Sequence, residues 1–300
     1  MSRARVHRDV ERALAAGRAV VALESTIITH GLPRPDNLAL ARRLEQVVTE
    51  GGAVPATVGV LDGQVHVGLT DPELATLAER GDVRKLSVRD LAPAMATGGT
   101  GGTTVSATAH LAARAGIAVF ATGGLGGVHR GAAVSRDVSA DLDTLARTPI
   151  AVVCSGVKSL LDVPGTLEQL ETLGVPVLGY RTDTFPGFYL ADAGLPVGWR
   201  LDDPAAVARV IREHRALGGG GVLVVNPVPA GAALDPAAHD AALDAALAAA
   251  EHTGVRGQAV TPFLLAELQQ RLGPSAVAAN VALVESNAAL AARIAVALAH

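Results

Sequence analysis

Short apolar runs, each closed by a polar or glycine-rich turn, recur along the chain and constrain its fold more than any other feature. They span residues 19–23, 117–121, 150–154 and 222–225. Each run is too short for a helix and apolar throughout, which is typical of a strand that is buried on both faces. Helical patterns separate the runs, so the sequence predicts a three-layer α/β/α fold with a central mixed, largely parallel sheet.

Residues 55–70 follow a different pattern, because apolar and small residues alternate on either side of Asp62-Gly63. This pattern predicts a β-hairpin inserted into the α/β fold. A helix is expected up to Glu50, with Asp36 or Asn37 capping its N-terminus. Because the chain shows no internal repeat and no linker of disordered composition, we expect one domain over residues 1–300.

Polar residues follow three of the apolar runs directly. These residues are Glu24, Thr122 and the segment Ser155–Lys158. Ligands of open α/β sheets bind outside the carboxyl ends of the strands, so these positions are expected to converge on one crevice. For Glu24 alone, a helix cap or a salt bridge is an equally good interpretation.

Lysine is rare in this chain. Of 25 basic residues only Lys85 and Lys158 are lysines, and the others are arginines. Arginine stays protonated and cannot form an imine, whereas a lysine in a desolvated pocket can lose its proton and attack a carbonyl carbon. We therefore consider Lys158 a candidate nucleophile, against the alternative of two incidental surface lysines.

Two glycine-rich stretches are candidate anion sites. Residues 97–106 (TGGTGGTTVS) open an expected helix, where backbone amides would suit a phosphate. A flexible connection is the commoner explanation, and the spacing fits neither a Walker A loop nor a dinucleotide fingerprint. Residues 122–127 let the backbone approach a ligand, and His129 and Arg130, which follow, could contact an anion or brace the loop.

Asp137 and Asp141 lie four residues apart, so they would share a face if their segment were helical. A divalent cation would ease the repulsion between them, and a helix-capping role for one of them is the alternative. Asn280 and Asn287 fall in the expected last helix, whose interior asparagine disfavours, so at least one is expected to reach a ligand.

The remaining unusual residues have plain alternatives. Phe185, Phe188 and Tyr189 in one loop indicate a lid, a subunit contact or local packing. Cys154 lies inside an apolar run and is expected to be inert.

Charge and composition exclude several classes of function. The net charge is −4 and no basic block occurs, which argues against nucleic acid and anionic membranes as partners. A single cysteine fits a reducing compartment, and neither a secretory signal nor an apolar run long enough to span a bilayer is expected. The expectation is a soluble cytoplasmic protein.

From the residues alone, a lysine and a carboxylate at converging strand ends, an aspartate pair suited to a metal, and glycine-threonine loops suited to phosphate indicate Schiff-base chemistry on a sugar phosphate. An aldolase fits the same set of residues, and sequence spacing does not separate the two.

Longer strings of residues separate them. The chain resembles the pseudouridine-5'-phosphate glycosidase family, also called indigoidine synthase A-like, from about residue 10 to residue 296. The matching runs are ALESTIITHGLPRPDN (22 to 37), VFATGGLGGVHRGA (119 to 132), DVSADL (137 to 142), VVCSGVKSLLDV (152 to 163), GVPVLGYRTDTFPGFY (174 to 189), NPVP (226 to 229) and TPFLL (261 to 265).

The resemblance implies reversible cleavage of pseudouridine 5'-phosphate to uracil and ribose 5-phosphate by a homotrimer with a mixed-sheet α/β/α fold. It implies that Lys158 is the covalent nucleophile, that Glu24 transfers a proton, and that Asp137 holds one Mn²⁺ per subunit. The substrate-contacting positions that it implies are Lys85, Val105, Thr122, His129, Ser139, Ala140, Asp141 and Asn280.

The chain departs from the family pattern at a few positions. Val88 replaces an arginine, Ser286 replaces an asparagine, and Ser155 and Val157 replace alanines near the lysine. None of these changes touches Glu24, Asp137 or Lys158. Bond chemistry on another ribosyl phosphate and a non-catalytic sugar-phosphate-binding module remain alternatives.

Overall fold

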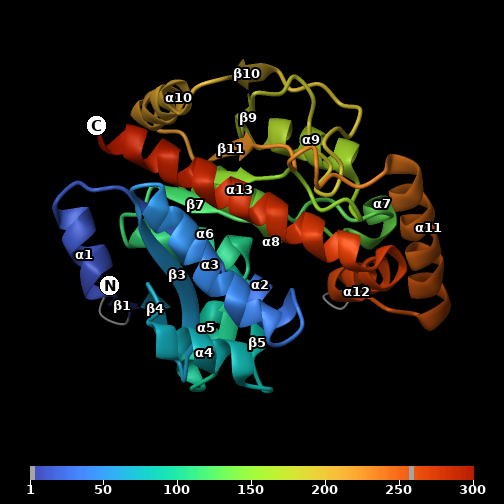
Figure 1. The fold of residues 1–300 in the computed structure, drawn as a ribbon, viewed down its shortest axis with the longest axis horizontal. Coiled ribbons are helices and arrows are strands. Elements are labelled where there is room, and N and C mark those ends of the chain that lie inside the picture. Colours follow the sequence, from blue (N-terminus) through green and yellow to red (C-terminus); the bar gives the residue numbers. More distant parts are fainter. Residues whose placement is uncertain (1–3, 257–259) are drawn as a thin grey trace.

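The strands form one mixed sheet, which is the centre of the fold (Figure 1). The computed structural model describes residues 4–256 and 260–300. Over these residues the strands are β1 (Ala4–Val6), β2 (Val20–Leu23), β3 (Val54–Leu61), β4 (Gln64–Val67), β5 (Arg84–Leu86), β6 (Gly101–Thr103), β7 (Val119–Ala121), β8 (Ala151–Cys154), β9 (Val177–Tyr180), β10 (Trp199–Leu201) and β11 (Val222–Val225). The sheet order is β1-β4-β3-β2-β7-β8-β11-β9-β10, and β6 joins β5 to β3.

Most of the sheet is parallel. From β3 through β2, β7, β8, β11 and β9 to β10, each strand is parallel to the next. The four apolar runs of the sequence became β2, β7, β8 and β11, and every residue in these strands is buried. The predicted three-layer α/β/α fold with a mixed, largely parallel sheet is therefore confirmed.

The predicted hairpin forms, although it is part of the central sheet and not an insertion. β3 and β4 pair antiparallel around Asp62 and Gly63, whose φ angles are 46° and 76°. The first half of β3 pairs in parallel with β2, and its second half pairs with β4 and β6. One long strand thus carries the change from parallel to antiparallel pairing.

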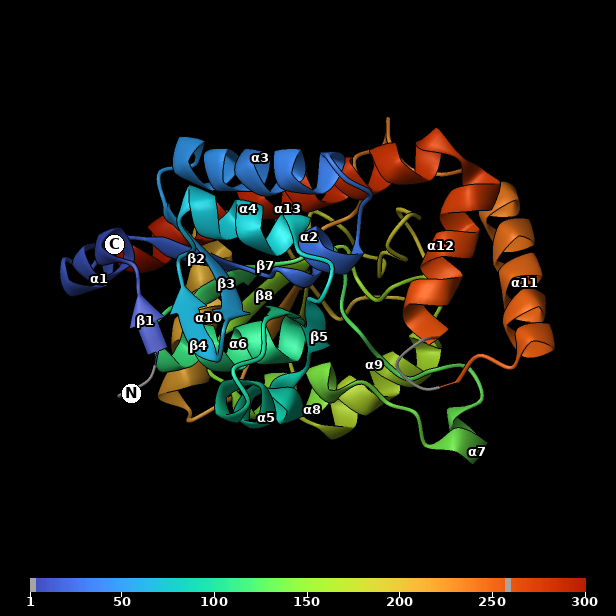
Figure 2. The same cartoon turned by 90° about the horizontal axis from the view of Figure 1, so that it is seen from below.

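Helices cover both faces of the sheet. They are α1 (Arg8–Ala15), α2 (Thr26–His30), α3 (Asp36–Glu50), α4 (Asp71–Glu79), the 3-10 turn η1 (Val88–Asp90), α5 (Leu91–Ala96), α6 (Val105–Arg114), α7 (Ala132–Ser135), α8 (Ala140–Arg147), α9 (Val163–Thr172), α10 (Pro204–Ala216), α11 (Pro236–Thr253), α12 (Val260–Leu272) and α13 (Pro274–Ala299). α3, α10 and α13 pack into one hydrophobic core, and α1, α6, α8 and α9 pack into another on the opposite face of the sheet. Figure 2 shows α3 and α13 on one side of the sheet and α6 and α8 on the other. α11 and α12 pack on each other at one end of the molecule.

α13 is the longest helix described and is more apolar than the sequence analysis allowed. Its 26 residues include an 18-residue window of mean hydropathy 1.6, so the expectation that no segment is long and apolar enough to span a bilayer was wrong. This helix packs against β2, β7, β8, α3 and α10. Its apolar character is explained by its place in the core, where Leu283, Leu290 and Ile294 are fully buried.

Two local expectations were decided by packing. Phe185, Phe188 and Tyr189 are all buried, which supports local packing over a lid. Neither Asp36 nor Asn37 caps α3, because Pro35 precedes the helix without a side-chain cap. Asn37 is instead buried, and its amide donates to the carbonyls of Ile28 (2.8 Å) and Ala78 (3.2 Å).

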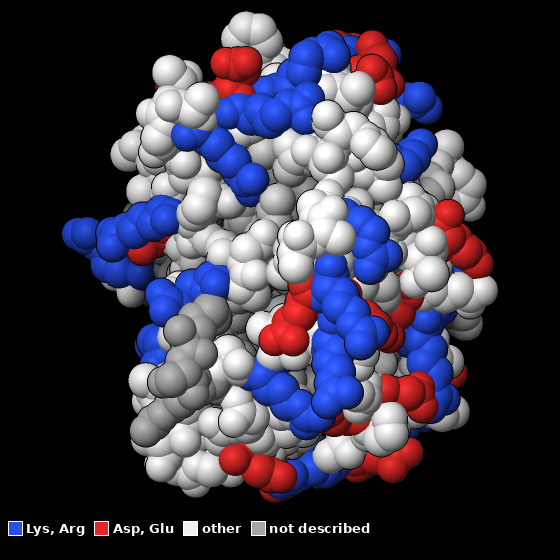
Figure 3. All heavy atoms as spheres, turned by 90° about the vertical axis from the view of Figure 1, so that its left-hand side faces the viewer, with Lys and Arg blue, Asp and Glu red and all other residues white. Residues whose placement is uncertain are grey.

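Charged side chains are interspersed on the face shown in Figure 3, where Lys and Arg side chains lie among Asp and Glu side chains and uncharged areas. Several of the arginines of the chain are paired, such as Arg80 with Asp62 and Asp82, and Arg200 with Asp183 and Asp202.

Candidate active site

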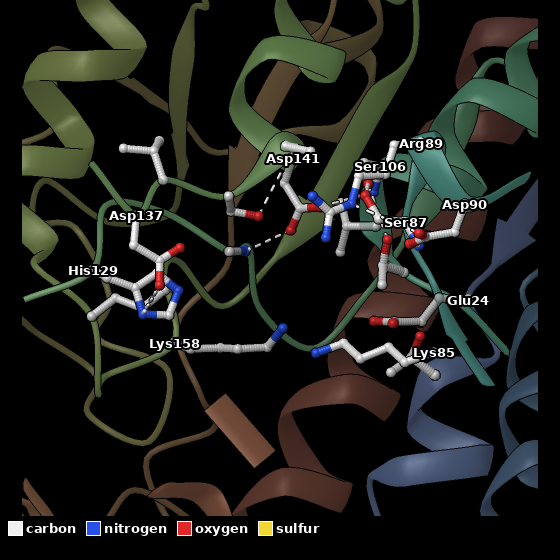
Figure 4. A pocket seen from close by; sticks show the side chains of 18 residues that line it. Glu24, Lys85, Ser87, Arg89, Asp90, Ser106, His129, Asp137, Asp141 and Lys158 are labelled. Atoms are coloured by element: carbon white, nitrogen blue, oxygen red, sulfur yellow. Dashed lines mark hydrogen bonds and ion pairs between the residues drawn. The ribbon is translucent and has the colours of Figure 1, made fainter. Parts of the chain in front are cut away.

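A cavity of about 240 Å³ lies at the carboxyl ends of the central parallel strands (Figure 4). A smaller cavity of about 70 Å³ adjoins it, and Glu24, Thr26, Lys85 and Lys158 line both. The larger one contains most of the residues that the sequence analysis singled out, namely Glu24, Lys85, Val105, His129, Asp137, Ser139, Ala140, Asp141 and Lys158. Asn280 lines the smaller one.

The sheet register places Glu24 and Thr122 side by side. Leu23 on β2 pairs with Ala121 on β7, so the next residues of the two strands are neighbours. The Thr122 hydroxyl donates a short hydrogen bond to the Glu24 carboxylate. Thr122 is buried and lines neither cavity, so it acts on the site through Glu24.

The pKa of the Glu24 carboxyl differs from its usual value. Burial raises the pKa of its carboxyl above the usual 4.5, and the charge of Lys158 and the bond from Thr122 offset part of that rise. A carboxyl with a raised pKa retains its proton at higher pH, which suits a group that must donate a proton to a substrate.

Lys158 and Lys85 extend toward each other from opposite sides of the cavity (Figure 4). Lys158 follows β8, and its backbone N–H donates to the Leu125 carbonyl at 3.1 Å. Lys85 lies on β5, which reaches the site through β6 and β3. Burial and the neighbouring charge of Lys158 lower the pKa of Lys85, while Asp141 and Glu24 oppose that shift.

Hydroxyl groups line the end of the cavity beside the N-terminus of α6. The Ser106 hydroxyl lies 3.0 Å from that of Thr104 and 3.2 Å from that of Ser87. Arg89 also lines this end, whereas Val88 packs on the core. Sequence reasoning missed Ser87 and Arg89, because nothing in the local pattern placed the turn after β5 against α6. Ser106, in contrast, belongs to the stretch 97–106 that was a candidate anion site.

The glycine-rich part of residues 97–106 is not a phosphate loop. Gly101 to Thr103 form β6, and only Thr104, Val105 and Ser106 of this stretch line the cavity. A Cβ at Gly101 would collide with Leu86, and a Cβ at Gly102 would collide with Thr29. These glycines therefore permit close packing of β6 against its neighbours.

Asp141 holds two loops of the site together. Its carboxylate is buried and accepts hydrogen bonds from the backbone N–H groups of Ser106 and Gly126, both at 2.9 Å. The first lies at the N-terminus of α6 and the second in the glycine turn after β7. Asp141 thus fixes the two walls of the cavity relative to each other.

The two aspartates do not share a helical face, because one helix does not contain both. α8 begins at Ala140, with Ser139 as its N-cap, and Asp137 lies outside it. Asp137 instead faces His129, with 3.9 Å between its Oδ2 and the imidazole Nδ1. Burial lowers the pKa of His129, and the Asp137 charge partly restores it. Arg130 points away, since its side chain donates to the Leu160 carbonyl and does not line the cavity.

The smaller cavity is more apolar. Ile27, Phe188 and Leu265 line it together with His30 and the Asn280 amide. Asn287, two turns further along α13, lies behind the site and is fully buried. Its amide donates to the Thr122 carbonyl (2.9 Å) and the Ser155 hydroxyl (3.1 Å) and accepts from Asn226 (3.0 Å).

Comparisons with known proteins agree with this architecture. The family model described as indigoidine synthase A like protein matches residues 9–297. Pseudouridine-5'-phosphate glycosidase of Streptomyces griseus is 59% identical over 293 residues, which cover 97% of this chain and 91% of that protein. Its counterpart in Salinispora tropica is 58% identical over 291 residues, which cover 96% and 90%.

Two solved structures share the fold over nearly the whole chain. The prealnumycin C-glycosynthase in complex with ribulose 5-phosphate is 40% identical, with a TM-score of 0.92 over 100% of this chain and 98% of that one. An indigoidine synthase A-like protein from Thermotoga maritima is 34% identical, with a TM-score of 0.90 over 99% and 97%. The resemblance inferred from the sequence motifs is confirmed, and the chain belongs to the indigoidine synthase A-like family.

Proposed function

We propose that this protein is a pseudouridine-5'-phosphate glycosidase, which reversibly cleaves the C–C glycosidic bond of pseudouridine 5'-phosphate to uracil and ribose 5-phosphate. The observation that carries the proposal is the convergence of Glu24, Lys85 and Lys158 on one cavity. The names of the relatives that are 58–59% identical support the same substrate.

Lys158 is the proposed nucleophile. A base joined to ribose through carbon is a poor leaving group, so the electrons of the breaking bond need a sink. Glu24, whose pKa is raised by burial, donates a proton to the ribose ring oxygen as the ring opens. The Lys158 amine displaces the protonated ring oxygen at C1', and its nitrogen lone pair forms an imine with C1' as the C1'–C5 bond breaks. Uracil leaves with the electron pair of that bond, which its ring carbonyl stabilises, and takes up a proton at C5. Hydrolysis of the imine then releases ribose 5-phosphate and the free amine.

The two ends of the site suit the two ends of the substrate. Ser87, Thr104 and Ser106 offer hydroxyls beside the N-terminus of α6, and Arg89 adds positive charge, which together favour the 5'-phosphate. The apolar walls and the Asn280 amide of the smaller cavity favour the planar uracil. Lys85, between them, faces the ribose.

A single Mn²⁺ at Asp137 is part of the proposal. Among the described residues no cluster of three or more His, Cys, Asp or Glu side chains surrounds a common point. The Asp137 carboxylate beside the His129 imidazole nevertheless fits a hydrated divalent cation, which keeps much of its water shell and prefers oxygen ligands. Such an ion would order water and the acidic loop near the substrate.

We further propose a homotrimer that acts in the cytoplasm. The trimer follows from the family resemblance, and light scattering coupled to size-exclusion chromatography tests it. The cytoplasmic assignment draws support from the single cysteine, Cys154, which is buried.

The proposal is tested by incubating the protein with pseudouridine 5'-phosphate and Mn²⁺ and measuring uracil by chromatography. Lys158→Ala is expected to abolish uracil release. Lys158→Arg keeps the positive charge but cannot form an imine, so it is expected to be inactive as well. Borohydride with ribose 5-phosphate should trap an adduct on Lys158, and retained activity in either variant would rule out the covalent mechanism.

The likeness to a C-glycosynthase favours one alternative, namely bond chemistry on a different ribosyl phosphate. That alternative predicts no uracil from pseudouridine 5'-phosphate but turnover of another C-nucleotide. Ligand binding without turnover of either substrate would instead identify a sugar-phosphate-binding module.

A further inference from the structure

A buried histidine that the proposed mechanism does not use lies against the residue after Lys158. His239, in the first turn of α11, is 2% exposed. Its Nε2 lies 2.8 Å from the Ser159 hydroxyl, and its Nδ1 lies 3.2 Å from the Asp240 carboxylate. Both ring nitrogens therefore have partners, and the Tyr189 ring packs edge-on against the imidazole at 6.4 Å between ring centroids.

The partners fix the direction of each hydrogen bond. A carboxylate only accepts, so in the neutral imidazole Nδ1 carries the proton toward Asp240 and Nε2 accepts from the Ser159 hydroxyl. The Ser-His-Asp order resembles that of a hydrolase, but Ser159 is 8% exposed and lines neither cavity. A substrate cannot reach its hydroxyl, so the chain of hydrogen bonds serves position and not attack.

The bond from Ser159 holds one side of the segment that carries Lys158. On the other side the Lys158 backbone N–H donates to the Leu125 carbonyl, and Val157 bridges Leu125 in parallel register. Those contacts tie the segment to the glycine turn after β7. His239 ties it to α11, which packs on α12.

We propose that His239 is a positioning residue, which through Ser159 holds Lys158 at the reacting carbon of the substrate. The inference rests on the proposed function, because it concerns the same lysine. A small displacement of a nucleophile costs rate without weakening the binding of the rest of the substrate. Loss of this hydrogen bond therefore lowers kcat and the rate of adduct formation, and leaves KM unchanged.

His239→Phe, which keeps the ring shape, is expected to lower kcat about tenfold with KM within twofold of the wild type. His239→Gln is expected to recover most of that loss, because its side-chain amide oxygen can accept from Ser159. Ser159→Ala should match His239→Phe, and the double variant should lose no more than either single one. His66→Phe removes another buried histidine, on β4 beside Glu73, and is expected to leave kcat unchanged.

Amide hydrogen exchange over residues 156–161 gives a readout that does not depend on the substrate. Exchange there should be faster in His239→Phe and Ser159→Ala, but not in His66→Phe. Equal kcat losses in His239→Phe and His66→Phe, independent losses in the double variant, or labelling of Ser159 by a fluorophosphonate would overturn the inference. If the wild-type protein releases no uracil while the variants still differ in exchange in this way, the proposed function is refuted and the hold of His239 on the Lys158 segment stands.

Discussion

Replacing Asn287 with leucine should destabilise the protein far more than the same replacement of Asn280 on the same helix. Asn287 is fully buried, and its side chain satisfies the Thr122 carbonyl, the Ser155 hydroxyl and one N–H of Asn226. Leucine offers none of these bonds, and each buried polar group left without a partner costs about 1–3 kcal/mol. The added apolar contacts of leucine recover about 1–2 kcal/mol.

The expected loss in free energy of unfolding for Asn287→Leu therefore centres on about 4–5 kcal/mol, which is a large fraction of the stability of a typical domain. Asn280 lines the smaller cavity, and its amide has no hydrogen-bond partner among the residues that the structure describes. Asn280→Leu should change stability by less than about 1 kcal/mol, while raising KM for pseudouridine 5'-phosphate. Urea denaturation followed by circular dichroism measures both free energies. Similar losses in the two variants would refute the argument that the buried network carries the difference.

Three further outcomes follow from single contacts. Because burial raises the pKa of Glu24, its contribution to stability is complete below the usual value of 4.5 and is lost as pH rises through the folded-state pKa. In urea titrations Glu24→Gln should therefore be more stable than the wild type at pH 7 but not at pH 4. The variant should be inactive at both pH values. Equal stability of the two proteins at pH 7 would contradict the raised pKa of Glu24. Gly126→Ala should lower uracil release at least tenfold, because the added Cβ would collide with Ser139 and Asp141. Near-normal activity would mean that Asp141 does not need its hydrogen bond from the Gly126 N–H. Burial raises the pKa of Cys154 to about 12, so iodoacetamide should leave the native protein unmodified at pH 8 and label it only in urea, as mass spectrometry would show.

The sequence predicted a strand correctly where both faces of that strand lie in the same, apolar environment. β2, β8 and β11 are buried on both faces, so their apolar runs coincide with the observed strands to within two residues. β1, β6 and β10 have three residues each and carry arginine or glycine, so their strand conformation depends on distant partners. α2 was missed for a related reason, since Thr26 to His30 are mostly β-branched residues that become helical where Ile28 packs into the core under α3 and α4.

The same distinction applies to the site. Glu24 and Thr122 could be placed together because both follow strands that end at one edge, and parallel neighbours end in register. Lys85, Ser87 and Asn287 could not, because they reach the site through β6, the turn after β5 and the far half of α13. Asp137 and Asp141 would share a face only if one helix contained both residues, and that condition is not met because α8 begins at Ala140.

The positions of the two lysines in the cavity explain why these residues are lysines in a chain that otherwise uses arginine. Both lysines of the chain line it, and their ammonium groups face each other where the charge of Lys158 lowers the pKa of Lys85. Two like charges in a partly buried site oppose folding, so stability alone does not explain the pair. Arginine is abundant elsewhere, yet Arg89 is the only arginine among the described residues lining the larger cavity, at its hydroxyl-rich end. A guanidinium suffices where an anion must be bound, whereas the centre of the cavity holds the one kind of cation that can also become a neutral amine. Under the proposed function, the distribution of the two residue types thus separates the end of the site that would bind the phosphate from the part that would react with the ribose.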